Sequence, residues 1–130
     1  MHPGIGQGRI TNNLATFINQ VDGASTISDD KSIAMLYELL DSEGLYLGAS
    51  SSLNVVAAVE LAQRLGKGEN CRLSSVVSLE IYSIEGSKVV TVLCDGAYRY
   101  QSRLFSKKWL ETKGLASAIP DHLQKYAVLD

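Results

Sequence analysis

Residues 88–96 read KVVTVLCDG, an almost unbroken apolar run that ends in a polar residue and a glycine. A strand with one solvated face alternates apolar and polar side chains, whereas a strand covered on both faces reads as a continuous apolar run. Such a strand belongs to a parallel sheet that has helices packed above and below it. The segment therefore predicts an α/β layer architecture for the chain around it.

A strong helix signal lies upstream of this run. Ser28 precedes Asp29 and Asp30, and apolar residues with helical spacing follow as far as Gly44. Serine is a preferred N-cap, carboxylates are stabilised at the positive end of the helix dipole, and glycine accepts the left-handed conformation after a helix. We therefore expect a helix that begins just after Ser28 and ends before Gly44.

Further elements alternate with this helix along the chain. Residues 45–47 predict a short buried strand, and residues 53–65 predict a second helix. Residues 100–113 predict a third helix, whereas residues 14–23 are read as a short strand with a loop. The alternation of helices and strands favours an α/β fold with a mostly parallel sheet.

Composition and charge exclude several classes of function. The 130-residue chain is 45% hydrophobic and 20% charged, which suits a single domain with its own core. Its net charge is −2 and its basic residues are spread out, so no nucleic-acid partner is indicated. No apolar stretch reaches the length of a membrane span. Cys71 and Cys94 lie far apart and fit neither a zinc knuckle nor a disulfide framework, so we expect a reduced, intracellular setting.

The segment GASSSLN, residues 48–54, places three serines where the short strand meets the second helix. One interpretation is helix capping, in which a serine oxygen accepts a hydrogen bond from an amide of the first turn. The other is a small-molecule site, because open α/β sheets bind ligands where a strand ends and a helix begins. A nucleophile elbow is not indicated, because Ser52 stands where that motif requires a glycine and neither His2 nor His122 has the context of a base.

Two other polar segments carry weaker signals. GIGQGR, residues 4–9, lacks the lysine of a phosphate loop and reads either as a glycine turn or as backbone that passes close to a flat ligand. Cys94 and Asp95 end the apolar strand, so they are expected to face the same crevice as the serines. Cys94 by itself favours a small core residue over a nucleophile.

Three blocks together resemble the C-terminal part of cysteine synthase. They are GIGQGRITNNL at 4–14, EGLYLGASSSLNVVAAVELAQRLGKG at 43–68 and VVTVLCDGAYRYQSRLFSKKWLETKGL at 89–115. They look most like the fungal and bacterial branch of this pyridoxal-phosphate-dependent family, and more distantly like cystathionine β-synthase. The GIGQGR and RYQSRLF motifs favour cysteine synthase over threonine dehydratase or tryptophan synthase β.

The resemblance implies that residues 1–130 form the C-terminal portion of a fold type II enzyme, a partial three-layer α/β sandwich with a mostly parallel sheet. It implies pyridoxal 5'-phosphate as cofactor and a β-replacement in which sulfide takes the place of the acetoxy group of O-acetylserine, which gives cysteine and acetate. Family members take small amino-acid substrates, are commonly homodimers, and occur in the cytoplasm or mitochondria.

The resemblance also assigns cofactor-binding positions. The first serine of the motif binds the pyridine nitrogen of the cofactor, and here that residue is Ser50. The turn formed by Gly4, Ile5 and Gly6 would lie beside the cofactor, and Asp95 would lie near the same edge of the ring. A hydroxyl can donate to a neutral nitrogen, whereas a carboxylate would hold it protonated. We therefore expect Ser50 to donate its proton to the ring.

The family's N-terminal half, with the lysine that binds the cofactor covalently, has no counterpart in this sequence. We assign no catalytic residue and expect the chain to be inactive alone; the initial Met1-His2-Pro3 is expected to be an artificial start. The alternative is a non-catalytic binding or interaction module derived from such an enzyme.

Residues 69–86 interrupt the resemblance. Joining Gly68 directly to Ser87 restores a tight helix-to-strand connection of the usual length. The segment is therefore expected to be an insertion, either a retained intron or an extra edge hairpin.

Overall fold

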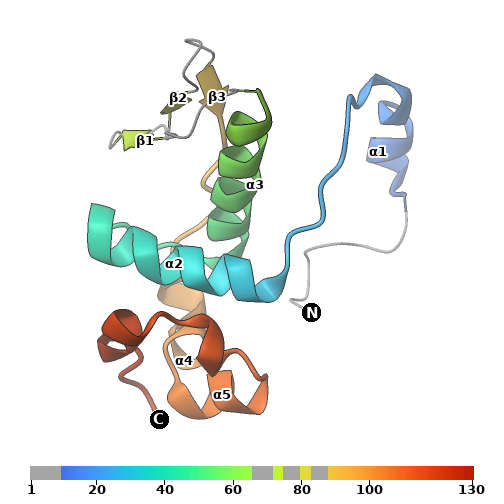
Figure 1. The fold of residues 1–130 in the computed structure, drawn as a ribbon. Helices are drawn as coiled ribbons and strands as arrows, with labels where there is room; N and C mark the ends of the chain where they lie inside the picture. The colour runs from blue at the N-terminus through green and yellow to red at the C-terminus, as the bar shows by residue number, and fades with distance from the viewer. Residues whose placement is uncertain (1–9, 66–71, 75–79, 83–87) are drawn as a thin grey trace.

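The computed structural model describes residues 10–65, 72–74, 80–82 and 88–130. Within these residues the protein is mostly helical and contains three short strands (Figure 1). The two long helices, α2 (Asp29–Glu43) and α3 (Ala49–Leu65), pack against each other. The strands lie beside the C-terminal end of α3, and the C-terminal helices lie on the other side of α2 (Figure 1).

Helix α2 confirms the prediction from the sequence at both ends. The Ser28 side chain accepts a hydrogen bond from the backbone N–H of Lys31, and two aspartates lie in the first turn. Gly44 ends the helix in the left-handed conformation, with φ of 68°. The helix buries one face, which contains Ile33, Leu36, Tyr37 and Leu39. Local cap chemistry and apolar spacing are therefore sufficient to define this element.

Helix α3 begins at Ala49, before the start that the apolar spacing predicted. The three serines consequently lie inside the first turn of the helix instead of preceding it. Val55, Ala58 and Ala62 are buried along one face and join a small core with Leu39 of α2. The expected strand at residues 45–47 is reduced to an isolated bridge, in which Leu47 pairs with Gly96.

The sheet differs from the expected parallel arrangement. Strands β1 (Arg72–Ser74), β2 (Glu80–Tyr82) and β3 (Lys88–Val90) form a three-stranded sheet in the order β1-β2-β3, and both pairings are antiparallel. The bridge between Leu47 and Gly96 is antiparallel as well. The sheet itself therefore has no parallel pair among the described residues, and parallel pairing is seen there only as an isolated bridge between Ser106 and Leu129. The apolar run 88–96 is a strand only over its first three residues.

Strands β1 and β2 fall within residues 69–86, the segment expected to be an insertion. Their antiparallel pairing is the arrangement of a hairpin that is added to β3 at the edge of the sheet. The remaining residues of the segment lie outside the described part of the chain. The origin of the segment stays a prediction.

The C-terminal region is built from short helices in place of the single helix predicted over residues 100–113. In chain order they are η2 (Ala97–Tyr100), α4 (Gln101–Leu104), α5 (Lys107–Thr112), η3 (Ala116–Ala118) and η4 (Asp121–Tyr126). The break follows from Ser106, whose side chain accepts from the backbone N–H of Trp109 and so starts α5 as a separate helix. Gly114 ends the helical run with φ of 69°, as predicted.

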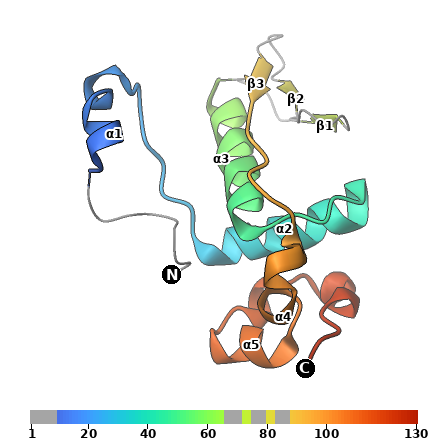
Figure 2. The ribbon, with the colours of Figure 1, turned by 180° about the vertical axis from the view of Figure 1, so that it is seen from behind.

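The N-terminal region forms an arm. Residues 14–23 were expected to form a short strand, but the structure has α1 (Asn12–Ala15) and the 3-10 helix η1 (Ile18–Gln20). The Thr11 side chain accepts from the backbone N–H of Leu14, so a local cap again outweighs the apolar pattern. Helix α1 of the arm stands apart from α2 and α3 in both views of the ribbon (Figures 1 and 2).

The larger core lies between α2 and the C-terminal helices. Leu36, Leu104 and Leu123 are fully buried in it, and the rings of Tyr37 and Phe105 are 5.3 Å apart. The Tyr37 hydroxyl donates a hydrogen bond of 2.8 Å to the backbone carbonyl of Leu104. Burial raises the pKa of Tyr37 far above its ordinary value, so this hydroxyl stays a donor.

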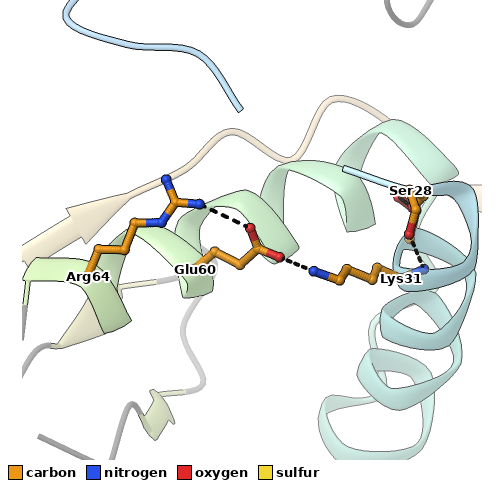
Figure 3. A network of polar contacts seen from close by, with 5 residues as sticks. Ser28, Lys31, Glu60 and Arg64 are labelled. Carbon is orange, nitrogen blue, oxygen red and sulfur yellow. Dashed lines mark hydrogen bonds and ion pairs between the residues drawn. The ribbon is translucent and has the colours of Figure 1, made fainter. Parts of the chain in front are cut away.

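An ion-pair network joins α2 to α3 on the outside of the fold (Figure 3). Lys31 Nζ lies 2.6 Å from Glu60 Oε1, and Arg64 lies 3.8 Å from the other carboxylate oxygen. The hydrogen bond from Lys31 holds the pKa of Glu60 below its ordinary value. Because both cations are well exposed, the network orients the two helices more than it stabilises them.

Replacement of Tyr37 by phenylalanine tests the polar contact inside the core. Tyr37→Phe should lower the free energy of unfolding by about 1–2 kcal/mol, because the buried carbonyl of Leu104 loses its hydroxyl donor. Urea unfolding followed by circular dichroism measures this change. Tyr126→Phe is the matched control, because its hydroxyl binds Asp41 in an exposed position and should matter less. Equal losses in the two variants would contradict the interpretation.

Candidate functional site at the start of helix α3

The candidate site forms where the segment before α3 meets the segment after β3. The backbone N–H of Gly48 donates to the carbonyl of Asp95 at 3.0 Å, and that of Ala97 donates to the carbonyl of Tyr46 at 3.1 Å. These bonds flank the bridge between Leu47 and Gly96. Two segments that are far apart in the sequence are thus held together at the N-terminal end of a long helix.

Ser51 secures this junction through the backbone of Asp95. Its hydroxyl donates to the carbonyl of Asp95 at 2.8 Å and accepts from the N–H of the same residue at 3.1 Å. The side chain of Ser51 is completely buried. A single buried hydroxyl therefore binds both backbone groups of Asp95, and the carbonyl of Asp95 accepts from the N–H of Gly48 as well.

Ser50 contacts the side chain of the same aspartate. Its Oγ lies 3.1 Å from Asp95 Oδ1, and both residues are half-buried. Because an ionised carboxylate can only accept, the hydroxyl donates its proton to it. Ser50 and Asp95, both predicted from the sequence, are therefore brought together by the fold.

Tyr100 is the third side chain of the cluster. It lies at the end of η2, and a hydrogen bond to the carboxylate of Asp95 raises its pKa. Arg99 and Arg103 act in the opposite direction on the same hydroxyl. Sequence reasoning did not assign a role to Tyr100, although it lies in the RYQSRLF motif that carried the family resemblance.

Gly48 allows the aspartate to approach this closely. A Cβ atom at residue 48 would collide with the carboxylate of Asp95, so only glycine leaves the carboxylate in place. The carboxylate of Asp95 therefore lies directly against the backbone of Gly48. A half-buried hydroxyl beside a carboxylate offers hydrogen-bonding groups that could orient a ligand with a polar nitrogen.

The remaining sequence predictions have mixed outcomes. Gly4, Ile5 and Gly6 lie outside the described residues. Cys94 is exposed, so its interpretation as a core residue was wrong; its sulfur accepts from Asn54 at 3.3 Å. The capping interpretation of the serines was wrong as well. The Ser52 hydroxyl donates to the carbonyl of Ala49 in its own helix, and the other two bind Asp95.

Two cavities lie elsewhere on the molecule. One, of about 350 Å³, is lined by residues of α5, η3 and η4. The other, of about 770 Å³, lies between residues 21–25 of the arm, one face of α3 and the strand β3 with Thr91. Neither is lined by Ser50 or Asp95. Among the described residues, no group of histidine, cysteine and acidic side chains could hold a metal ion, and no helix has the length and apolar character needed to cross a membrane.

Comparison with known proteins decides the family. The chain is 60% identical to cysteine synthase 1 of Neurospora crassa and 58% identical to cysteine synthase 1 of Emericella nidulans, in each case over 126 residues and 97% of this chain. The chain is a homologue of the cysteine synthases. A weaker match, 32% identical over 87 residues, links this cysteine synthase homologue to cystathionine beta-synthase of Rattus norvegicus.

The homologue spans 29% of the length of each of the two fungal cysteine synthases. The match to the rat cystathionine beta-synthase covers 67% of this chain and 12% of the length of the rat protein. No family model matches the chain. The relationship therefore applies to one segment of those enzymes.

Replacement of Ser51 by alanine tests the junction. Ser51→Ala should lower the free energy of unfolding by about 1–3 kcal/mol, because it leaves the N–H of Asp95 without its partner, while the carbonyl of Asp95 keeps the hydrogen bond from Gly48. Ser52→Ala is the matched control: it is equally buried, but its hydroxyl donates only to carbonyls at the start of its own helix. We expect a loss below about 1 kcal/mol there. Chemical denaturation of both variants measures the difference, and similar losses would refute the assignment.

The contact between Asp95 and Tyr100 can be tested by titration. Asp95→Asn removes the negative charge that favours the neutral phenol, so the pKa of Tyr100 should fall towards its ordinary value. The ¹³Cζ resonance of Tyr100 measured against pH reports this change. Asp41→Asn, which affects the hydroxyl of Tyr126 instead, should leave Tyr100 unchanged. An unaltered Tyr100 titration in Asp95→Asn would show that the contact is absent in solution.

Proposed function

We propose that this protein supplies the C-terminal part of a cysteine synthase, an enzyme that makes cysteine from O-acetylserine and sulfide by β-replacement. The observation that carries the proposal is the match to two fungal cysteine synthases over 97% of the chain at 58–60% identity. The segment that carries the serines lies within the region of high similarity and forms a polar cluster with Asp95. Small amino acids are the substrate class, and a homodimer is the expected assembly.

The proposed cofactor is pyridoxal 5'-phosphate. Its ring nitrogen would lie towards Ser50 and Asp95, the polar pair at the start of α3. Gly4, Ile5 and Gly6 are proposed to lie beside the cofactor. When bound, the cofactor acts as an electron sink for the carbon from which the substituent leaves. This chain's own contribution is to orient the ring and to fix the hydrogen bonds at its nitrogen.

The covalent lysine and the phosphate cradle belong to the rest of such an enzyme, so we propose that this segment has no turnover by itself. In the intact assembly, residues 45–47 and 88–96 would join a mostly parallel sheet of a three-layer α/β sandwich. One match is to a protein named putative mitochondrial cysteine synthase of Saccharomyces cerevisiae, 31% identical over 110 residues. Cytoplasm and mitochondria are therefore the compartments we propose.

A non-catalytic interaction module is the second candidate. The observation that favours it is the groove of about 770 Å³ between the arm and α3. Exposed apolar residues border this groove: Val21 is 50% exposed, Leu61 47% and Val90 70%. Apolar side chains gathered in this way mark surfaces that another chain covers. Such a partner would engage α3 on the side that carries Leu53, Ala57 and Leu61.

A chimeric enzyme tests the catalytic proposal. The matching segment of the Neurospora crassa cysteine synthase 1 is replaced by this chain, and cysteine formation from O-acetylserine and sulfide is measured. We expect activity within about thirtyfold of the parent, because interface mismatches of about 1–2 kcal/mol cost no more than that. The isolated chain should give none. A folded, cofactor-loaded chimera without activity would contradict the catalytic proposal and favour the module.

A further inference from the structure

The cavity of about 350 Å³ among the C-terminal helices is a second place where a small ligand fits. Ligand pockets in proteins begin at about 300 Å³ and combine a mostly apolar lining with a few polar groups. Residues of α5, η3 and η4 form this cavity together. Neither Ser50 nor Asp95 lines it. A ligand bound there would therefore not occupy the proposed cofactor site.

The floor of the cavity is apolar and preformed. Leu110, Ile119 and Ala127 line it, and all three are buried members of the larger core. The backbone N–H of each donates to a carbonyl of its own segment, at 3.0 Å, 3.3 Å and 3.1 Å respectively. Because this floor does not have to be ordered by a ligand, little binding free energy is lost when an aliphatic group is placed on it.

The rim of the cavity carries one cation and one anion. Lys107 and Glu111 both line it, and both are exposed. They lie four positions apart on α5, so their Cβ atoms are about 5–6 Å apart on one face of the helix. Neither side chain forms an ion pair within the part of the chain that the structure describes. Lysine before glutamate is the less favourable order for a pair at this spacing, so both charges remain available to a ligand.

Gln124 of η4 adds an acceptor to the rim. Its side-chain nitrogen donates to Asp121 Oδ1 at 3.3 Å, and that bond does not use its amide oxygen. The rim therefore offers an ammonium group as donor, and a carboxylate and an amide oxygen as acceptors, above an apolar floor.

We propose that this cavity binds a free α-amino acid with an aliphatic side chain. The ligand's carboxylate pairs with Lys107, its ammonium group pairs with Glu111 and the amide oxygen of Gln124, and its side chain rests on the apolar floor. A purely anionic ligand such as phosphate would be repelled by Glu111, and a hydrocarbon would leave both charges unused. The inference does not rest on the proposed function, because it uses no residue of the cluster at the start of α3.

Titration of the full chain, labelled with ¹³C in its methyl groups, with L-leucine tests the proposal by nuclear magnetic resonance. The methyl signals of Leu110, Ile119 and Ala127 should shift in a saturable way, with a Kd of roughly 1 mM for a ligand of this size. Isocaproate lacks the ammonium group and isoamylamine lacks the carboxylate. Each should bind about tenfold more weakly, because it loses one charge-assisted contact.

Variants assign the two charges. Lys107→Gln and Glu111→Gln should each weaken L-leucine binding about three- to tenfold. Lys107→Gln should leave the binding of isoamylamine unchanged, and Glu111→Gln should not weaken that of isocaproate. Lys108→Gln is the matched control, because Lys108 lies on the same helix without lining the cavity. Ala116→Leu, which fills the cavity, should abolish binding while circular dichroism shows that the helices are retained.

The contrary outcomes are distinct. Floor methyl groups that do not shift at L-leucine concentrations well above the expected Kd would overturn the proposal. Shifts confined to Val55 and its neighbours would place the amino acid near the start of α3 and would overturn it too. Isocaproate that binds as tightly as L-leucine would refute the assignment of an amino acid. The activity of the chimera decides the proposed function independently of all three results.

Discussion

The hydroxyl of Ser51 is the contact on which the described architecture depends. It is completely buried, and it binds both the N–H and the carbonyl of Asp95. This contact fixes the start of α3 against the segment that follows β3, so the small core around Val55 and the larger core around Leu104 are built on either side of one junction. Burial makes the contact strong, because an unsatisfied backbone group in this position could not bind water instead.

The sequence predicts elements whose signals are local and fails where pairing is distant. Helix α2 was predicted at both ends, because Ser28 and Gly44 act on their immediate neighbours. Ser106 is also a local cap, but the apolar spacing on both sides of it hid the break between α4 and α5. The direction of strand pairing depends on which segments meet in space, and an apolar run alone does not contain this information.

Two residues of the candidate site were predicted from the sequence, but the hydrogen bonds that join its side chains were not. Ser50 and Asp95 were both identified from the sequence, and the fold joins them. The sequence singled out Ser50 but did not separate Ser51, which binds the backbone of Asp95, from Ser52, which binds the carbonyl of Ala49. Adjacent residues of a helix point in directions about 100° apart, so a single burial boundary is enough to separate them. Tyr100 was missed because its contact with Asp95 forms only in the folded chain.

The junction has one more consequence, which concerns chain entropy. The contact between Ser51 and Asp95 joins residues 44 positions apart, and residues 69–86 lie entirely within the loop that it closes. The cost of closing a loop grows only with the logarithm of its length, so removing these eighteen residues would change that cost by about 0.5 kcal/mol. The two ends of the loop are held by hydrogen bonds that the intervening residues do not supply. Chains with and without this segment can therefore close the same junction at almost the same free energy, and the loop is a place where length can vary while the site is kept.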